Sequence, residues 1–125
     1  MTTLKVGIAS YDEMKALTLA VARGQRKLAP REPRVWFPST ESFAKVLSAG
    51  NRDLLRVIAE SAPESLDDLA ALTGRKKSNL SRTLKTMANY GLVRLERGVR
   101  GRIAAKVAYD RVELELPLVR KGYAA

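Results

Sequence analysis

The sequence predicts an α+β fold, in which a strand-helix extension precedes a run of helices that ends in a β-hairpin. Three observations predict it. Apolar residues alternate over two short stretches near the N-terminus, at 4–10 and 35–39. They recur at helical spacing between residues 51 and 91, and two strand-like runs then flank the turn GVRG at 98–101. Helical and strand-like patterns that occupy separate stretches of a chain favour the α+β class.

Residues 1–49 form the predicted extension. The stretch LKVGIAS at 4–10 has the alternation of a strand, and YDEMKALTLAVARG at 11–24 has the spacing of a helix, with Gly24 as its terminator. Two prolines and several basic residues then indicate an extended linker over 25–34. Its arginines and lysine either make a second contact with a polyanion or are simply solvated. A second short strand, VWFPS, follows at 35–39.

Three helices are predicted after the second strand, each with its own start signal. Ser39 or Thr40 can cap a helix that ends at Gly50. Asn51 can cap the next one, RDLLRVIAES. Ser65 and Asp68 have the spacing of a capping box, which opens the short helix LDDLAALTG.

The longest helical pattern, TGRKKSNLSRTLKTMANYG, runs to Gly91 and has two unlike sides. At 100° per residue, the apolar side gathers Leu80, Leu84, Met87 and Ala88. The opposite side and its flanks carry groups suited to phosphates and base edges: Ser78, Asn79, Ser81, Arg82, Lys85 and Asn89. A solvated surface helix is the ordinary explanation, but exposed helices usually mix both charge signs. Between Arg75 and Asn89 there are five basic residues and no acidic one.

The basic excess is concentrated around this helix. The whole chain carries a formal net charge of +10. Residues 69–106 contain ten Lys and Arg against a single acid, Glu96, whereas residues 51–69 contain five acids and two basic residues. Such segregation favours a surface that binds a polyanion, nucleic acid before anionic membrane.

A hairpin is predicted after Gly91, over the runs LVRLERG and RIAAKVAY. Its tip is basic and carries glycines at 98 and 101, which allow close approach to a nucleic-acid backbone. The alternating stretch VELELPL at 112–118 predicts one further strand, so we divide the chain into residues 1–49, 50–111 and 112–125.

The stretch SLDDLAALTGRKKSNLSRTLKTMANYGLVRLERG resembles winged helix-turn-helix DNA-binding domains of the MarR and ArsR-like kind. The small residue Ala70, the turn residue Gly74 and the apolar Leu80 have the spacing of that motif. The order of segments over the whole chain is similar to small prokaryotic proteins described as DNA-binding, some of which are similar to TumA-type antitoxins. Lys76 departs from the pattern, because it stands where such domains place a capping Ser or Thr.

The resemblance implies a recognition helix in the major groove and a basic wing on the phosphate backbone or in the minor groove. We therefore expect eleven residues to contact DNA: Arg75, Lys76, Lys77, Ser78, Asn79, Ser81, Arg82, Lys85, Arg97, Arg100 and Arg102. DNA half-sites related by symmetry favour a homodimer. The two N-terminal strands are too few for a stable sheet, so we expect residues 1–49 to pair with a second copy of the chain or with a different protein. We expect residues 50–125 to fold without that extension, because this part has a predicted core of its own: Leu54, Leu69, Leu72, Leu80, Leu84 and Leu92.

The composition argues against several other functions. The chain has no cysteine and no histidine, which removes disulfides and the commonest metal ligands and catalytic bases, so we expect no enzyme, no metal and no cofactor. No secretory signal or membrane-spanning run is recognised, and we expect a cytoplasmic protein. The prediction is a dimeric transcriptional repressor that binds double-stranded DNA. The alternatives are an antitoxin that neutralises a partner toxin and autoregulates its operon, and an RNA-binding protein.

Overall fold

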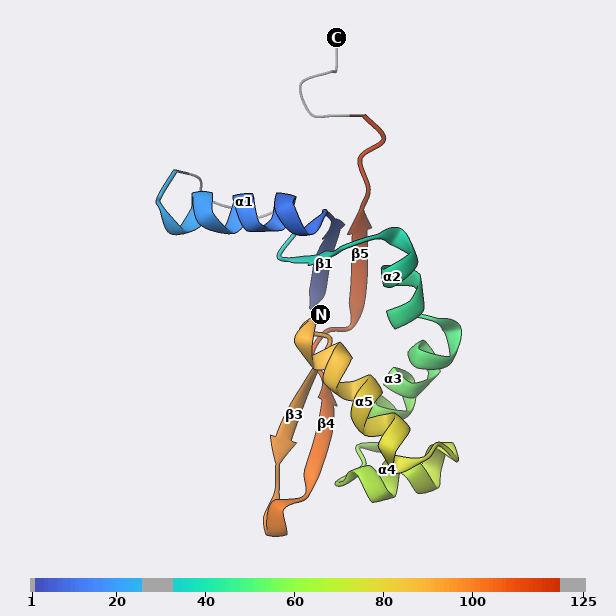
Figure 1. Ribbon diagram of the computed structural model, residues 1–125. Coiled ribbons are helices and arrows are strands. Elements are labelled where there is room, and N and C mark those ends of the chain that lie inside the picture. Colours follow the sequence, from blue (N-terminus) through green and yellow to red (C-terminus); the bar gives the residue numbers. More distant parts are fainter. Residues whose placement is uncertain (1, 26–32, 120–125) are drawn as a thin grey trace. The chain divides into compact units, whose positions relative to one another are not determined.

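The computed structural model describes residues 2–25 and 33–119, and both helices and strands are present in them (Figure 1). This mixture agrees with the α+β class predicted from the sequence. The chain divides into two compact units. The sheet unit consists of residues 3–43 and 111–125, and the helical unit consists of residues 44–110 together with the first two residues.

The sheet unit contains three parallel strands in the order β2-β1-β5: β1 (Thr3–Ile8), β2 (Val35–Phe37) and β5 (Arg111–Glu115). β1 is the central strand, with Val6 opposite Val35 and Leu4 opposite Val112. The sequence predicts residues 112–125 as a separate segment and predicts that a second chain completes the sheet of the two N-terminal strands. Instead, these strands pair with each other, and the C-terminal strand completes their sheet.

One face of this sheet is apolar, because residues paired in register share a face. It carries Leu4, Val6, Ile8, Val35, Phe37, Val112 and Leu114. Leu4, Val6 and Phe37 are buried, and the ring of Phe37 meets that of Phe43 edge to face at a centroid distance of 5.2 Å. The opposite face carries Lys5, Arg111 and Glu113, together with Trp36, whose ring lies so close to Gly7 that a β-carbon there would clash with it. The sheet is therefore amphipathic.

Helix α1 (Tyr11–Ala22) follows β1 and begins with a complete capping box. The Ser10 hydroxyl accepts a hydrogen bond from the backbone N–H of Glu13, and the Glu13 carboxylate accepts one from the Ser10 N–H. None of its residues is fully buried. The predicted apolar stripe is thus only partly covered: Met14, Leu17 and Ala20 are half-buried and Val21 is exposed. Most of the predicted basic linker, residues 26–32, lies outside the described residues.

The next two helices are α2 (Thr40–Val46) and α3 (Ala49–Ser61), and the predicted boundary between them is wrong. Ser48 caps α3 by accepting a hydrogen bond from the backbone N–H of Asn51 at 3.2 Å, so Gly50 lies in the first turn of α3 and does not end α2. Asn51 is a residue of the helix rather than its cap. Its side-chain amide donates to the carbonyl of Val46 at 3.1 Å. The start of α3 is therefore fixed by a serine placed three residues before the amide that it accepts from.

The helical unit continues with α4 (Leu66–Thr73) and α5 (Lys77–Asn89), then the antiparallel strands β3 (Val93–Arg97) and β4 (Ile103–Val107). As predicted, Ser65 caps α4 through the N–H of Asp68, and Gly74 ends it in the left-handed conformation at φ 75°. The core of this unit is aliphatic: Leu54, Ile58, Leu69, Leu80, Leu84, Met87, Leu92, Val93 and Ala105. Leu72, which the sequence analysis also assigns to this core, is 54% exposed because Leu69 takes the inward position on α4.

Candidate nucleic-acid interface

Helix α5 has a buried side and a polar side, as its sequence predicts. Leu80, Leu84 and Met87 are buried where α5 packs against α4 and β3. The residues between them are exposed on the outer side: Ser78, Asn79, Ser81, Arg82, Lys85 and Asn89. None of these six side chains forms a hydrogen bond or ion pair with another described residue. This face is therefore available to an external partner.

The first turn of α5 is positively charged and lacks a side-chain cap. Lys76 occupies the N-cap position with φ −68° and ψ 141°, and it makes no capping hydrogen bond. The first backbone N–H groups of a helix point along its axis at the positive end of the helix dipole. Together with the exposed ammonium groups of Lys76 and Lys77, this turn suits an anion such as a phosphate.

Two of the predicted contact residues also bind within the chain. The Arg75 guanidinium donates to the carbonyl of Gly50 at 2.9 Å and to the side-chain oxygen of Asn51 at 3.1 Å. It thereby ties the turn before α5 to the first turn of α3, a role that the sequence analysis does not anticipate. The Lys77 ammonium lies 3.2 Å from a carboxylate oxygen of Asp67 on α4. Both of these side chains are exposed, so we expect this ion pair to contribute no more than about 1 kcal/mol.

The hairpin β3–β4 has one mainly apolar face and one charged face. Val93 lies opposite Val107, Leu95 opposite Ala105 and Arg97 opposite Ile103, so these pairs share one face of the hairpin. The other face carries Arg94 directly opposite Lys106, with Glu96 two residues along. Lys106 is half-buried and is a basic neighbour of Arg94 that the sequence analysis does not include among the contacts.

The tip of the hairpin is a tight turn that holds its arginines outward. The backbone N–H of Gly98 donates to the carbonyl of Arg102 at 2.6 Å, which closes the turn. Arg100 adopts the left-handed conformation at φ 60°, as does Gly101 at φ 72°. Arg97, Arg100 and Arg102 are all exposed. A non-glycine residue in this region of conformational space costs about 1 kcal/mol, so arginine at position 100 slightly destabilises the fold.

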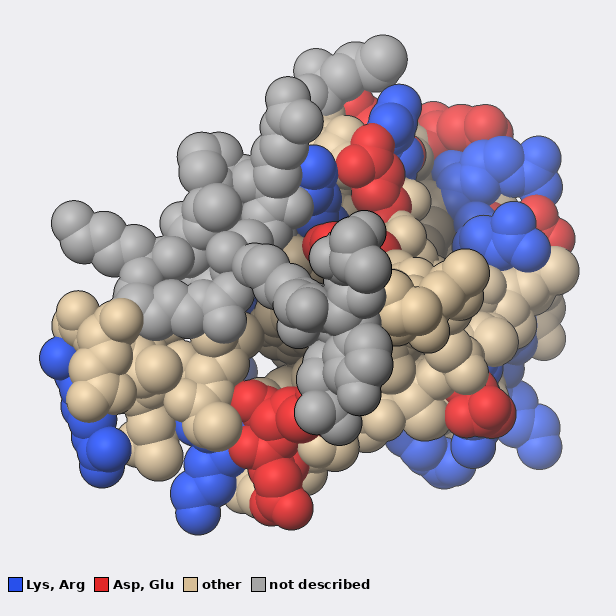
Figure 2. Space-filling model, turned by 90° about the horizontal axis from the view of Figure 1, so that it is seen from above, with Lys and Arg blue, Asp and Glu red and all other residues tan. Residues whose placement is uncertain are grey.

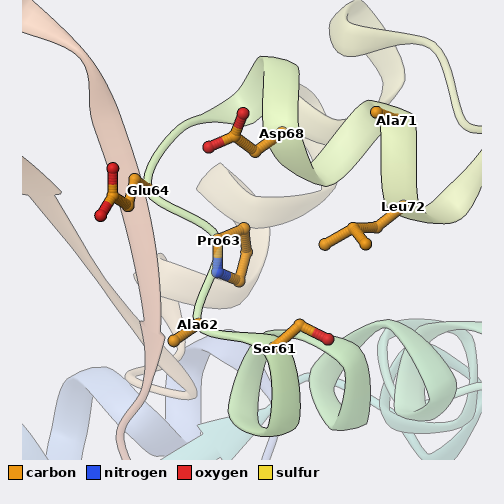
Figure 3. A pocket seen from close by; sticks show the side chains of 7 residues that line it. All are labelled: Ser61, Ala62, Pro63, Glu64, Asp68, Ala71 and Leu72. Atoms are coloured by element: carbon orange, nitrogen blue, oxygen red, sulfur yellow. The ribbon is translucent and has the colours of Figure 1, made fainter.

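The face of the molecule that Figure 2 draws carries both cationic and anionic side chains. A hollow of about 380 Å³ lies between the end of α3 and α4, lined by Ser61, Ala62, Pro63, Glu64, Asp68, Ala71 and Leu72 (Figure 3). Its two charged residues are both acidic, which does not suit a polyanion.

The described residues contain no cluster of three or more His, Cys, Asp and Glu side chains that could hold a metal ion. None of the helices in 2–25 and 33–119 is long and apolar enough to cross a membrane. The exposed face of α5 and the arginines of the hairpin tip form the candidate site, because both gather exposed polar and cationic side chains. Local sequence patterns do not predict the contacts of Arg75 with Gly50 and Asn51, since these residues stand 25 and 24 positions earlier in the sequence.

The model of one protein family, described as HVO_A0114, matches residues 46–114. The matched segment covers more than half of the chain, including α3, α4, α5 and the hairpin β3–β4. No curated protein and no solved structure matches the chain.

Proposed function

The chain belongs to the HVO_A0114 family, and we propose that it binds double-stranded DNA in a sequence-specific manner and regulates transcription as a dimeric repressor. In this proposed role the helical unit is a winged helix-turn-helix, with α4 and α5 as the helix pair and β3–β4 as the wing. The role involves no catalysis and no cofactor.

One observation supports the proposal above the others. The outer side of α5 carries two cations, two serines and two asparagines whose side chains have no partner among the described residues, while the opposite side is fixed in the core. Arg and Lys can donate to guanine, Asn can bond both edge groups of adenine, and Ser can donate or accept. A rigid helix with such a face is suited to the major groove.

The hairpin supplies the sequence-independent part of the interaction. Three exposed arginines at its tip can neutralise phosphates or enter the minor groove. Lys76 and the uncapped first turn of α5 can hold a further phosphate. Arg75 acts mainly by positioning, since its guanidinium is bound to Gly50 and Asn51.

The experiment is selection of bound duplexes from a random DNA pool, followed by affinity measurements on the best sequence. Arg82→Ala should cost about 1–3 kcal/mol on that sequence and relax the preference at one base pair. Arg56→Ala is the matched control, because it removes the same charge from an exposed position on α3. Equal losses for the two variants, or selection that yields no preferred sequence, would contradict base recognition by α5.

The wing is tested by replacing Arg97, Arg100 and Arg102 with Ala. Affinity should fall for all sequences alike, and the dependence of log K on log salt should flatten by about 0.9 for each phosphate that is no longer neutralised. An unchanged salt slope would remove the hairpin from the interface. A duplex RNA or single-stranded RNA that competes as well as the selected DNA would favour the RNA-binding alternative.

The antitoxin alternative has its own supporting observation in the sheet unit. Helix α1 has no fully buried residue, and its Tyr11, Leu19 and Val21 are exposed. Exposed apolar side chains such as these are available to bind another protein. Co-expression with the product of an adjacent small gene, followed by co-purification that Leu19→Asp abolishes, would support this function. DNA binding would then serve autoregulation.

A further inference from the structure

We propose that the outer edge of β5 is where two copies of the chain associate, by antiparallel pairing of the two β5 strands about a two-fold axis at Glu113. The inference rests on the homodimer in the proposed function and specifies which surface forms it. The occupant of the edge is therefore a second copy of this chain.

The first observation is that β5 has one paired edge. It stands at the end of the strand order β2-β1-β5, with its register against β1 running from Thr3–Arg111 to Gly7–Glu115. Among the described residues, no backbone group outside β1 hydrogen-bonds to residues 111–115. An exposed edge with open N–H and C=O groups is a template for pairing with another strand.

The second observation is that β5 is complementary to itself when it is turned around. With Glu113 on the axis, Arg111 of each copy lies opposite Glu115 of the other, and Val112 lies opposite Leu114. All five residues of the strand are then paired. The apolar face of one sheet continues into that of the other, and so does the charged face.

Other registers fit less well. A shift by one residue would place the charged face of one strand beside the apolar face of the other. A shift of the axis to Leu114 would set Glu113 against Glu115 twice, where the axis at Glu113 brings together one pair of glutamates, and it would pair only three residues of β5. A shift to Val112 keeps an Arg–Glu pair but pairs only three residues of β5.

The two Glu113 carboxylates at the axis are compensated within each chain. The Arg111 guanidinium pairs with Glu113 across the strand face, and Lys5 of β1 lies 3.8 Å from it. The hydrogen bond from Arg111 holds the pKa of the Glu113 carboxyl below its ordinary value, so the group stays ionised near neutral pH. Four cations thus surround the two carboxylates that meet at the axis.

The third observation is the apolar surface that adjoins this edge. Leu114 is 37% exposed and Leu116 is 47% exposed, and Leu118 and Val119 are exposed further along. Five paired residues per chain would bury little area in themselves, and a stable dimer usually buries about 800 Å² on each partner. The aliphatic side chains that continue from β5 supply surface for such an interface.

Charge exchange in the full chain provides the sharpest test. Glu115→Arg sets two arginine side chains against each other at both ends of the paired strands, and Arg111→Glu sets two acids against each other in the same way. Each variant should dimerise at least about tenfold more weakly than the parent, because symmetry doubles every change. An equimolar mixture of the two should restore the dimer, since opposite charges then face each other at both ends. Glu64→Arg, an exposed charge reversal in the helical unit, is the control and should leave dimerisation unchanged.

A cross-link locates the axis. The chain has no cysteine, so Glu113→Cys introduces a single thiol. Residues directly opposite in an antiparallel pair have α-carbons about 4.5–5.5 Å apart, which lies within the range that a disulfide spans, so mild oxidation should cross-link the two copies. Thr18→Cys, on the exposed surface of α1, should stay uncross-linked under the same conditions.

Light scattering during size-exclusion chromatography measures the dimer without DNA, so the result is independent of whether the chain binds DNA. A parent chain that stays monomeric at high concentration would overturn the inference. So would a dimer that tolerates both single reversals, or a mixture that does no better than its components. A failure to bind DNA with the dimer behaviour as expected would instead overturn the proposed function and leave this interface standing.

Discussion

Replacing Arg75 tests whether this residue positions α5 or contacts DNA directly. Its guanidinium donates to the Gly50 carbonyl at 2.9 Å and to the Asn51 side-chain oxygen at 3.1 Å. The second of these bonds is partly buried, and Asn51 is itself bonded to Val46. Arg75→Ala therefore removes two hydrogen bonds and leaves the acceptor on Asn51 without its donor.

The magnitude follows from these contacts. A hydrogen bond with a charged partner contributes about 1.5–3 kcal/mol, and a neutral or exposed one about 1 kcal/mol or less. Because the bond to Gly50 is exposed, we expect Arg75→Ala to lower the free energy of unfolding by about 2 kcal/mol. In a unit of this size, that corresponds to a fall in melting temperature of roughly 8–16 °C. Arg75→Lys should recover part of the loss, since lysine cannot form the forked contact.

The assay is thermal unfolding beside DNA binding at several salt concentrations. Arg82→Ala is the comparison, because its side chain has no partner among the described residues and its loss should change stability by less than about 0.5 kcal/mol. If Arg75 positions α5, its replacement weakens binding but leaves the salt slope close to that of the parent. An Arg75→Ala chain that is as stable as Arg82→Ala and has a flatter salt slope would make Arg75 a phosphate contact and refute the reasoning.

Three further predictions concern the helical unit. Arg100→Asn should keep or slightly raise stability, because asparagine tolerates the left-handed conformation, while DNA affinity falls as the charge is lost; paired melting and binding curves check it. Leu84→Ala should cost about 2–5 kcal/mol and Leu72→Ala less than about 1 kcal/mol in chemical denaturation, since the first is buried and the second exposed. A fragment of residues 44–110 should show a cooperative melt and remain monomeric in light scattering, because it retains the Ser48 cap and the whole aliphatic core.

Local patterns predict the helical unit well where each signal is contained within a few residues. Ser65 and Gly74 mark both ends of α4, because one side-chain oxygen and one left-handed glycine are enough to start and stop a helix. The buried positions of α5 follow from a spacing of three and four residues. The tip of the hairpin lies where glycines interrupt two alternating runs.

The predictions that failed depend on choices between similar local signals. Ser48 and Asn51 are both good caps, and which of them starts α3 depends on Asn51 being engaged by Val46 and Arg75 instead. Leu69 and Leu72 are equally apolar, and only packing decides which of them faces inward. Neither the composition nor the spacing of apolar residues shows which of two such residues takes the role.

The pairing of β1 with β5 lies beyond local inference for a different reason. Thr3 and Arg111 stand opposite each other although almost the whole chain separates them. An alternating stretch indicates a strand but not its partner, so residues 112–118 could be recognised as a strand and still be assigned to no sheet. A fragment of residues 50–125, which the sequence analysis expects to fold, would carry β5 without β1 and would also lack the Ser48 cap. The boundary that the structure supports lies at residues 44 and 110.

The buried side of α5 holds the exposed side of the helix in a fixed geometry. Arg82 and Lys85 alternate with Leu80, Leu84 and Met87, so each of these two outward residues has an inward neighbour within two positions. Burial of the inward set fixes the backbone under the outward set before any partner arrives. The entropy lost on binding is then largely that of the side chains, which is smaller than the cost of ordering a loop. The same positive face has no acidic residue of α5 to pair with, and the proposed DNA binding would supply the missing negative charge.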